Sequence, residues 1–489
     1  DKGLPVMVDD ISIMNKTPTM IIGTIDKFAI FPWKENVQKI FGLNEQGNRD
    51  KSPPSLIIQD ELHLISQSLG SVAGLWEGMI EYFCTDLETN IKPKIICSTA
   101  TIKEYKEQIL CLYGREKSKI FPPPGINIED SYFGSYEKNI EVRKKTSKMF
   151  VGVYAPNDGS PLTTQKRLFT CLTHVPHLMK DEEKDPWWTN MVFCNSIREL
   201  NGAETVIQSD MHQYIRVYCS RFSKGNINYR TPRPERLTGE LPSDQVPEML
   251  NKLQIPFGSS SPSPLDICLA TNILEVGVDI DRLSLMTVIG QPKTTSTYIQ
   301  ATGRVGRDQK RPGLIVTLYS PSKPRDKSHY ENFFSYHQRL YSEVEPTSVT
   351  PFTPEVLKRV FHSIIVSYIK MHGQKSPRPF PEDKLEELKD LYIKRIKKIN
   401  NFRSFPDSDW LKYFEDRYKI LFDEMKYRNR AEWISIRGDE DALMVAAGDN
   451  SLNASEKVFW KGMLNMRSVD SEASIDITDN YDVMDGPDA

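Results

Sequence analysis

Short apolar runs alternate with longer mixed segments through the first 125 residues of the chain. Three runs predict strands, at 20–22, 56–58 and 94–97, and the stretch 72–83 carries apolar residues at helical spacing. Strands that alternate with helices favour a parallel α/β sheet, whose ligand chemistry lies at the carboxyl ends of the strands. Thr24, Asp60 and Ser98 each follow one of these runs, so we expect them to share one edge of a sheet.

A second α/β series follows a proline-rich break at 121–125. Apolar runs at 191–194, 265–270, 285–289 and 314–319 predict strands of a second parallel sheet. From Thr353-Pro354 onward, a good helix start, the apolar residues recur at helical spacing and predict packed helices. The pattern therefore predicts a first α/β region at 1–125, a connector at 126–185, a second α/β domain at 186–322, a helical accessory region at 323–467 and an acidic tail, expected to be disordered, at 468–489.

The composition is that of an ordinary globular protein. Of the 489 residues, 39% are hydrophobic and 26% are charged, and no apolar stretch approaches the ~18 residues of a membrane span. The net charge of −3 gives no global nucleic-acid signal, but it does not exclude binding through a few local contacts. Seven scattered cysteines without a C-x-x-C pattern indicate a reducing cytoplasm. His174 and His177 have no partnering Cys/His cluster, so we predict no metal site there.

Two carboxylates stand shortly after the apolar run 56–58, in the sequence Asp60-Glu61-Leu62-His63. Hydrolysis of a phosphoanhydride needs Mg²⁺ at the phosphate oxygens and a positioned water. Asp60 suits the Mg²⁺ shell and Glu61 suits orienting or deprotonating the water, while His63 would face an opposite lobe. Acidic tetrapeptides are common on surfaces, but the apolar run before this one favours a strand end.

Small hydroxyl residues follow the next predicted strand, in the sequence Ser98-Thr99-Ala100-Thr101. They could relay hydrogen bonds between a nucleotide site and a neighbouring surface. The pattern is weak alone and gains weight from its predicted place beside Asp60.

Two further motifs lie in the second series. After the strand at 265–270, Thr271 could bond a nucleic-acid phosphate, Gly277 permits a tight approach, and Asp279 could accept from a ribose hydroxyl or an arginine. We predict a short helix over 300–307 that presents two arginines, three residues apart, on one face. The planar fork of arginine binds phosphate bidentately, so these side chains could supply positive charge from across a cleft.

In order and spacing these motifs resemble motifs II, III, V and VI of superfamily 2 helicases: DELH at 60–63, STAT at 98–101, ATNILEVGVDI at 270–280 and QATGRVGR at 300–307. GTIDK at 23–27 looks like motif Ib, FCNS at 193–196 resembles motif IV, and LTGE at 237–240 resembles the element after it. The resemblance implies two RecA-like parallel-sheet lobes, the first incomplete at its N-terminus, followed by a mainly helical region. It also implies an ATP-dependent motor with ATP and Mg²⁺ as cofactors, hydrolysing ATP between the lobes.

The resemblance assigns roles to individual residues. It implies catalytic roles for Asp60, which would also hold the metal, and for Glu61, His63, Arg304 and Arg307. ATP-binding or coupling roles fall on Ser98, Thr99, Ala100, Thr101, Gly277, Asp279, Gln300 and Gly303. Nucleic-acid contacts fall on Gly23, Thr24, Lys27, Asn195, Ser196, Thr238, Gly239, Thr271 and Asn272.

Longer phrases resemble the DrmA-type helicases of the bacterial DISARM anti-phage system. They are ELHLISQSLGSVAGLWE at 61–77, FPPPG at 121–125, GQPKTTSTYIQATGRVGR at 290–307, KPRDKSHYENFFSYH at 323–337 and VEPTSVTPFTPEVL at 344–357. This resemblance implies a DNA translocase in phage defence that acts on single-stranded or tailed duplex DNA, with a DrmB-type protein partner and no membrane.

One family element is missing, because no G-x-x-x-x-G-K-[ST] phosphate loop occurs in the 489 residues. The loop would precede Gly23, so we expect that a longer polypeptide or another subunit supplies it, and that the chain alone has little or no ATPase activity. Two alternatives stay open. One is a catalytically incomplete nucleic-acid-binding subunit, and the other is an RNA helicase, because backbone contacts carry little sequence information.

Overall fold

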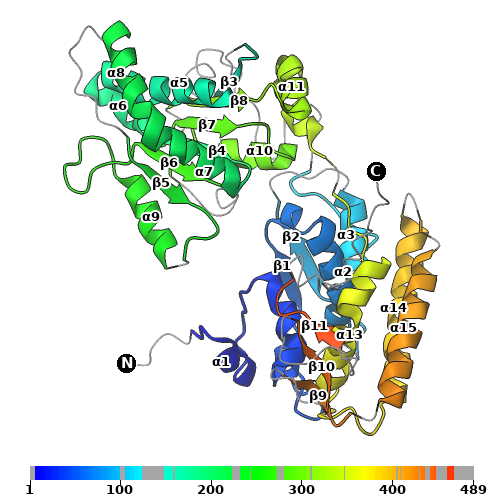
Figure 1. The fold of residues 1–489 in the computed structure, drawn as a ribbon. Coiled ribbons are helices and arrows are strands. Elements are labelled where there is room, and N and C mark those ends of the chain that lie inside the picture. Colours follow the sequence, from blue (N-terminus) through cyan, green and yellow to red (C-terminus); the bar gives the residue numbers. More distant parts are fainter. Residues whose placement is uncertain are drawn as a thin grey trace, which may run out of the picture. The chain divides into compact units, whose positions relative to one another are not determined.

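The computed structural model describes most of the chain, which divides into two compact units (Figure 1). Unit 1 combines residues 1–119 with 346–489, and unit 2 spans residues 120–345. Unit 1 contains two small parallel sheets and one core cluster, and unit 2 contains a six-stranded parallel sheet with a core cluster on each face. The described residues are 6–86, 88–99, 105–123, 148–157, 160–222, 232–242, 244–271, 280–308, 311–345, 347–403, 406–407, 409–428, 430–435, 441–447 and 460–466.

The first part of unit 1 places short helices around a parallel pair of strands. The strands are β1 (Leu56–Gln59) and β2 (Lys94–Cys97), and the helices are α1 (Asp10–Asn15), η1 (Ile25–Trp33), η2 (Val37–Phe41), η3 (Leu62–Leu64), α2 (Gln67–Cys84) and α3 (Tyr105–Tyr113).

The two faces of this strand pair differ. Ile57 and Ile95 pack against the core, whereas Ile58 and Ile96, on the opposite face, are 62% and 48% exposed. Parallel sheets are normally covered on both faces, so this arrangement is unusual.

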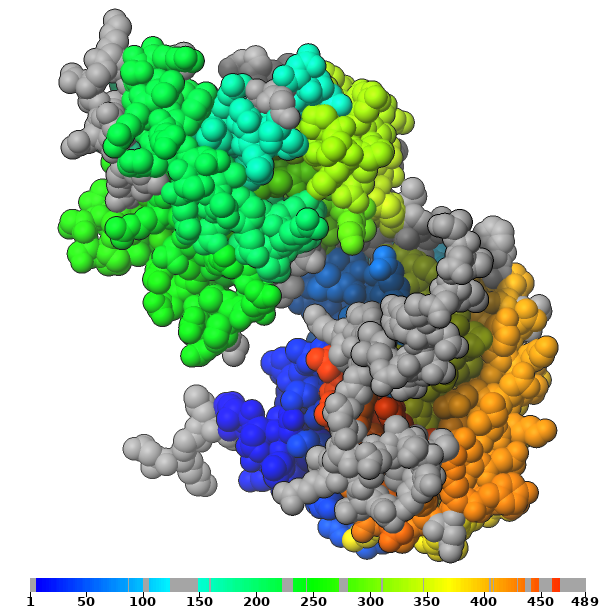
Figure 2. Space-filling model, viewed as in Figure 1, coloured from blue at the N-terminus to red at the C-terminus, as the bar shows by residue number. Residues whose placement is uncertain are grey.

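The C-terminal helices of unit 1 share one core with α2. They are α13 (Pro354–Met371), α14 (Glu382–Phe402) and α15 (Asp409–Tyr427), and α14 and α15 form the orange surface in Figure 2. Glycines allow the close approach of α2, because a Cβ on Gly78 would lie 3.1 Å from the Tyr392 ring. Tyr392 donates to the Leu75 carbonyl at 2.7 Å, and the Arg395 guanidinium donates to the Leu112 carbonyl at 2.8 Å.

A small parallel sheet, which the sequence pattern does not predict, completes unit 1. Its strands are β9 (Glu432–Ser435), β10 (Ala442–Ala446) and β11 (Trp460–Gly462), in the order β11-β10-β9. His362 of α13 contacts the Lys461 carbonyl through Nε2 at 2.8 Å, and Trp33 of η1 donates to the Met463 carbonyl at 3.1 Å. Hydrogen bonds therefore hold the segment around β11 against η1 and α13.

Unit 2 is a six-stranded parallel sheet in the order β3-β8-β7-β4-β6-β5. Its strands are β3 (Lys148–Tyr154), β4 (Asn190–Cys194), β5 (Pro234–Leu237), β6 (Ile267–Ala270), β7 (Leu285–Ile289) and β8 (Gly313–Tyr319). Its helices are α5 (Pro161–His174), η4 (Val175–Leu178), α6 (Asp181–Trp188), α7 (Ile197–Thr205), η5 (Val206–Asp210), α8 (Met211–Phe222), α9 (Gln245–Gln254), α10 (Thr295–Thr302), α11 (Pro324–Glu331), α12 (Phe333–Gln338) and η7 (Leu340–Glu343).

Both faces of this sheet are buried. Met191 and Phe193 of β4 enter one core with residues of α9 and α10, whereas Val192 and Cys194 enter another with residues of α5, α7 and α8. Because successive side chains of a strand point to opposite faces, a continuous apolar run such as 191–194 is typical of such a strand.

The structure confirms the predicted fold class of α/β parallel sheets with a mainly helical C-terminal region. The strand predicted at 20–22 is wrong: these residues form no ladder within the described chain, and Met20 and Ile22 are 70% and 83% exposed. Residues 126–185 were expected as a connector, yet their described part supplies β3, α5 and α6 to unit 2. The tail expected at 468–489 lies outside the described residues. Among the described helices, none combines the length and apolarity needed to cross a membrane.

Candidate functional site

The carboxyl ends of β1 and β2 bring the first two motifs together. Asp60 follows β1, Ser98 follows β2, and the Ser98 hydroxyl donates to Asp60 Oδ1. The backbone joins the same two turns, because the Leu62 N–H donates to the Ser98 carbonyl at 2.9 Å. Parallel pairing in register makes this meeting possible, since Gln59 lies opposite Cys97 at the ends of the strands.

Glu61 adopts an uncommon backbone conformation. Its φ and ψ are 51° and 49°, in the left-handed region that non-glycine residues rarely occupy. The turn is stabilised by Asp60 Oδ1, which accepts from the Glu61 N–H at 3.0 Å. Strained residues of this kind cluster at functional sites, so the conformation directs attention to this carboxylate.

His63 links the acidic turn to the hydroxyl motif. Its ring is buried, and its Nδ1 lies 3.1 Å from Thr99 Oγ1 and 3.5 Å from Glu61 Oε2. Gln108 of α3 stabilises the turn, because its side-chain amide donates to the carbonyls of Leu62 and Ile65 at 3.2 and 2.8 Å. Ala100 and Thr101, the rest of the predicted motif, lie outside the described residues.

The oxygen donors of this edge fit a Mg²⁺–nucleotide complex. Mg²⁺ prefers hard oxygen ligands and is commonly held by one or two carboxylates together with substrate phosphates. Asp60 is exposed at the strand end and offers one such carboxylate. In the described parts of the chain there is no group of three or more His, Cys, Asp or Glu residues that could hold a metal without help from phosphates.

The segment resembling motif Ib does not follow a strand, which corrects the expectation for Thr24. Gly23 and Thr24 are exposed, and Thr24 is the N-cap of η1. Lys27 is held by an ion pair with Asp10 at 2.7 Å. The apolar residues before Thr24 have no partner strand in the described chain, and their side chains are exposed.

In unit 2, several predicted nucleic-acid contacts share the carboxyl edge of the sheet. Ser196 follows β4, Thr238 and Gly239 follow β5, and Thr271 follows β6. The strands β4, β6 and β5 are neighbours in that order, so these residues line one continuous edge. Thr238 and Thr271 are largely buried, at 5% and 8% exposure, whereas Ser196 and Gly239 are exposed.

Asn195 makes a hydrogen bond within unit 2 that the sequence did not predict. Its amide Nδ2 donates to the Ile289 carbonyl at 2.8 Å and so ties the end of β4 to the end of β7. Asn272, Gly277 and Asp279 lie outside the described residues.

The helix predicted over 300–307 ends five residues earlier than expected, so the predicted C-terminal end was wrong. Helix α10 ends at Thr302, with Gly303 as its C-cap, so Arg304 and Arg307 lie in the following turn. The turn is imposed by Gly306, which has φ 61° and donates to the Leu283 carbonyl at 2.7 Å. A Cβ at Gly306 would lie 2.6 Å from the Gly313 Cα.

Gly306, in the turn that carries the two arginines, contacts Leu283 and Gly313 near the amino ends of β7 and β8, whereas Gln300 is buried on α10. Lys148, at the start of β3, is a further cation here that the sequence analysis missed. Its Nζ donates to the Thr302 carbonyl at 3.0 Å. Burial and the neighbouring Arg307 lower the pKa of Lys148 to about 8. A single lysine before an apolar run gives no sequence signal for this position.

Comparisons with known proteins show similarity to helicases. The helicase conserved C-terminal domain family matches residues 172–309. The chain is 34% identical over 520 residues to the DISARM protein DrmA of Bacillus paralicheniformis, an alignment that covers 98% of this chain and 45% of DrmA. It is 31% identical over 103 residues to the Druantia protein DruE of Escherichia coli, covering 21% of this chain and 5% of DruE.

Among solved structures, the helicase MrfA bound to DNA has a TM-score of 0.50 at 17% identity, covering 79% of this chain and 45% of MrfA. That likeness shows the fold. The chain spans less than half the length of DrmA and of MrfA. Similarity to DrmA over nearly the whole chain, together with the helicase domain match, makes this protein similar to helicases and to DrmA of the DISARM system, in keeping with the helicase motifs of the sequence.

Proposed function

We propose that this chain is the body of an ATP-dependent DNA translocase or helicase that serves anti-phage defence in the bacterial cytoplasm. The observation that carries the proposal is the joined edge of β1 and β2, where Ser98 bonds Asp60 and Glu61 holds a left-handed conformation. A left-handed non-glycine residue at a strand end is typical of functional sites, which supports a role for this carboxylate.

Each site residue has its own proposed role in ATP hydrolysis. When bound, ATP supplies the phosphoanhydride and Mg²⁺ neutralises the charge of its phosphates. Asp60 would hold the metal, and Glu61 would orient the attacking water. Arg304 and Arg307 of unit 2 would meet the charge that develops on the terminal phosphate.

The contact from Glu61 through His63 to Thr99 supports a coupling role for the hydroxyl motif. Movement of Glu61 would change the contact between His63 and Thr99, because Nδ1 of His63 lies 3.5 Å from Glu61 Oε2 and 3.1 Å from Thr99 Oγ1. Nucleotide turnover in unit 1 would thereby be transmitted to residues that follow Thr99.

DNA is the proposed substrate of the carboxyl edge of unit 2. Ser196, Thr238 and Thr271 would contact the phosphate backbone there, and Thr24 would do so in unit 1. MrfA, whose fold this chain resembles, is bound to DNA in its solved structure, which supports DNA as the substrate. A DrmB-type protein is the proposed partner. Competition between matched DNA and RNA strands at one stated salt concentration tests the preference.

The bare face of the β1–β2 pair supports the proposal that a phosphate loop comes from polypeptide outside these residues. Leu56, Ile58 and Ile96 are 49%, 62% and 48% exposed on that face. Parallel sheets are normally covered on both faces, so an exposed apolar face is a place for a further segment to pack. We propose that the segment carrying the loop packs against this face.

Replacing Glu61 by Gln in the full-length protein tests the assignment. We expect the loss of DNA-stimulated ATP hydrolysis with retained nucleotide binding, because Gln keeps the shape of the side chain but cannot act as a base. Glu248→Gln, on the exposed surface of α9, is the matched control and should behave as the parent protein. Undiminished turnover in Glu61→Gln would remove Glu61 from the mechanism.

The second candidate function is a catalytically incomplete subunit that binds nucleic acid. The missing phosphate loop favours it. Such a subunit would bind DNA with an affinity that does not respond to ATP, even as the full-length protein. The motor, by contrast, should bind DNA differently in its nucleotide-bound and nucleotide-free states.

A further inference from the structure

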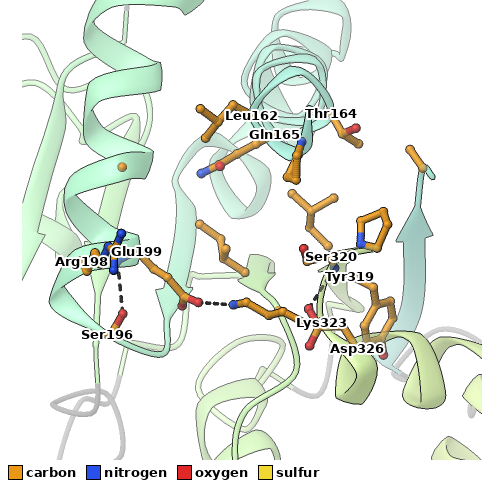
Figure 3. Close-up of a pocket in the computed structure, with 17 residues that line it drawn as sticks. Leu162, Thr164, Gln165, Ser196, Arg198, Glu199, Tyr319, Ser320, Lys323 and Asp326 are labelled. Atoms are coloured by element: carbon orange, nitrogen blue, oxygen red, sulfur yellow. Dashed lines mark hydrogen bonds and ion pairs between the residues drawn. The ribbon is translucent and has the colours of Figure 1, made fainter. Parts of the chain in front are cut away.

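Unit 2 contains a cavity of about 450 Å³ at the carboxyl edge of its sheet (Figure 3). It lies where β4 and β7 end, between Ser196 and Gly290. The chain leaves β4 toward β5 on one side and leaves β7 toward β8 on the other. Such a reversal opens a crevice between neighbouring strands, and ligands of open α/β sheets bind in that crevice.

The cavity has apolar walls and the size of a ligand pocket. Leu162 of α5, Ile289 of β7 and Leu318 of β8 provide aliphatic surface. Its volume lies within the ~300–1,000 Å³ typical of small-molecule sites. Gly202 of α7 leaves room, since a Cβ added there would meet no atom within 4 Å. A flat ring system with apolar faces fits these walls.

One buried polar group at the cavity lacks a partner. Gln165 of α5 is 6% exposed, and its Nε2 has no hydrogen bond to any described residue. Figure 3 shows its side chain reaching from α5 toward α7. A buried donor without an acceptor is unfavourable, so the site favours a ligand that brings one. Side-chain amides of this type pair with the edges of nucleobases.

Positive charge stands beside the same cavity. Arg198 is exposed on the first turn of α7, whose N-terminus attracts anions. Ser196 is the N-cap of α7: its Oγ accepts from the Glu199 N–H at 3.2 Å, while Glu199 Oε2 accepts from the Asn195 N–H at 3.0 Å. Lys323 is neutralised by an ion pair with Glu199, so Arg198 is the cation available to a phosphate.

We propose that this cavity binds one nucleotide unit, with its base between the aliphatic walls and Gln165, and its phosphate at Arg198. The unit is either a free mononucleotide or a nucleotide of a DNA strand lifted out of its stack. In the second case the inference rests on the proposed DNA binding. All the lining residues belong to unit 2, so the site is separate from the one at Asp60.

Two probes and four variants test the proposal. AMP binding to the 489-residue chain is measured by calorimetry without Mg²⁺, with Asp60→Asn as a control for binding at the β1 edge. Strand binding is measured with an oligodeoxyadenylate that carries one fluorescent adenine analogue, whose emission rises when it is unstacked. Gly202→Leu fills the cavity, Gln165→Leu removes the amide at similar size, and Gly202→Ala is the matched control.

A free mononucleotide is the ligand if AMP binds and both leucine variants weaken it about tenfold or more, the range expected when a buried hydrogen bond or its space is lost. Asp60→Asn and Gly202→Ala should then change AMP affinity little. A strand nucleotide is the ligand if the analogue brightens on binding and Gly202→Leu abolishes the rise, while strand affinity falls by less than about tenfold.

Failure of this proposal is distinguishable from failure of the proposed function. If the strand does not bind but AMP binds in the manner described, DNA binding fails and the nucleotide pocket stands. If the strand binds and neither probe responds to Gly202→Leu, the pocket proposal is overturned and DNA binding stands. If neither probe binds, the pocket proposal is overturned as well.

Discussion

Replacing Glu77 by Gln should stabilise unit 1 in a strongly pH-dependent way. Glu77 lies in the middle of α2 and is 4% exposed. Burial raises its pKa to about 8, from 4.5, against the partial opposition of Arg395. The native protein therefore keeps the proton of Glu77 up to about pH 8, whereas the unfolded chain releases it near pH 4.5.

The sign and size of the effect follow from this difference. Between pH 4.5 and about 8 the native state binds more protons than the unfolded state, so the free energy of unfolding falls as pH rises. At ~1.36 kcal/mol per pKa unit, the whole shift corresponds to about 5 kcal/mol. Gln mimics the protonated acid and does not titrate, so the variant should match the parent near pH 4.5 and exceed it by up to that amount above pH 8.

The assay is urea unfolding followed by tryptophan fluorescence across this pH range, since Trp76 is adjacent to Glu77 and fully buried. Glu415→Gln, on the exposed side of α15, is the control and should keep the slope of the parent. Parallel pH profiles for Glu77→Gln and the parent protein would refute the reasoning, because they would mean that Glu77 is ionised in the folded state.

Three further substitutions test other parts of the structure. Gly306→Ala should destabilise unit 2 by more than about 1 kcal/mol in thermal unfolding, because residue 306 has a positive φ and the added Cβ would clash with Gly313. The control Gly202→Ala should instead stabilise unit 2 by roughly 0.5–1 kcal/mol. Equal effects of the two substitutions would contradict the geometry of the turn at Gly306. Lys148→Met should remove the rise in the free energy of unfolding between pH 8 and 10.5 that the buried amine of the parent produces, and a persistent rise in that window would assign it to another group. Asn195→Ala should lower the free energy of unfolding by about 1–2 kcal/mol, because the Ile289 carbonyl loses its donor, and an unchanged value in urea would show that this bond is dispensable.

Continuous apolar runs and turn residues made much of the fold predictable. The run 191–194 has no polar position because β4 is buried on both faces, and a run of that kind has few other structural uses. The meeting of Asp60 and Ser98 follows from parallel pairing, which places consecutive strand ends at one edge. The run 20–22 is equally apolar, but a strand needs a partner for its ladder, and apolar character alone does not supply one.

Long-range and backbone features escaped the sequence pattern for physical reasons. The end of α10 at Thr302 depends on the contact of Gly306 with Gly313, which the local helical spacing of the arginines does not reveal. Lys148 approaches Thr302 only because β3 pairs with β8, a contact between distant parts of the chain. The left-handed conformation of Glu61 is set by the turn and not by the preference of glutamate.

The most direct test of the central claim is ATP hydrolysis stimulated by single-stranded DNA. It compares this 489-residue chain with a form extended upstream to its natural start, each with and without Glu61→Gln. We predict turnover in the extended form alone and its loss in Glu61→Gln. Failure of both forms to hydrolyse ATP in the presence of DNA would contradict the motor and leave the nucleic-acid-binding subunit as the account of this chain.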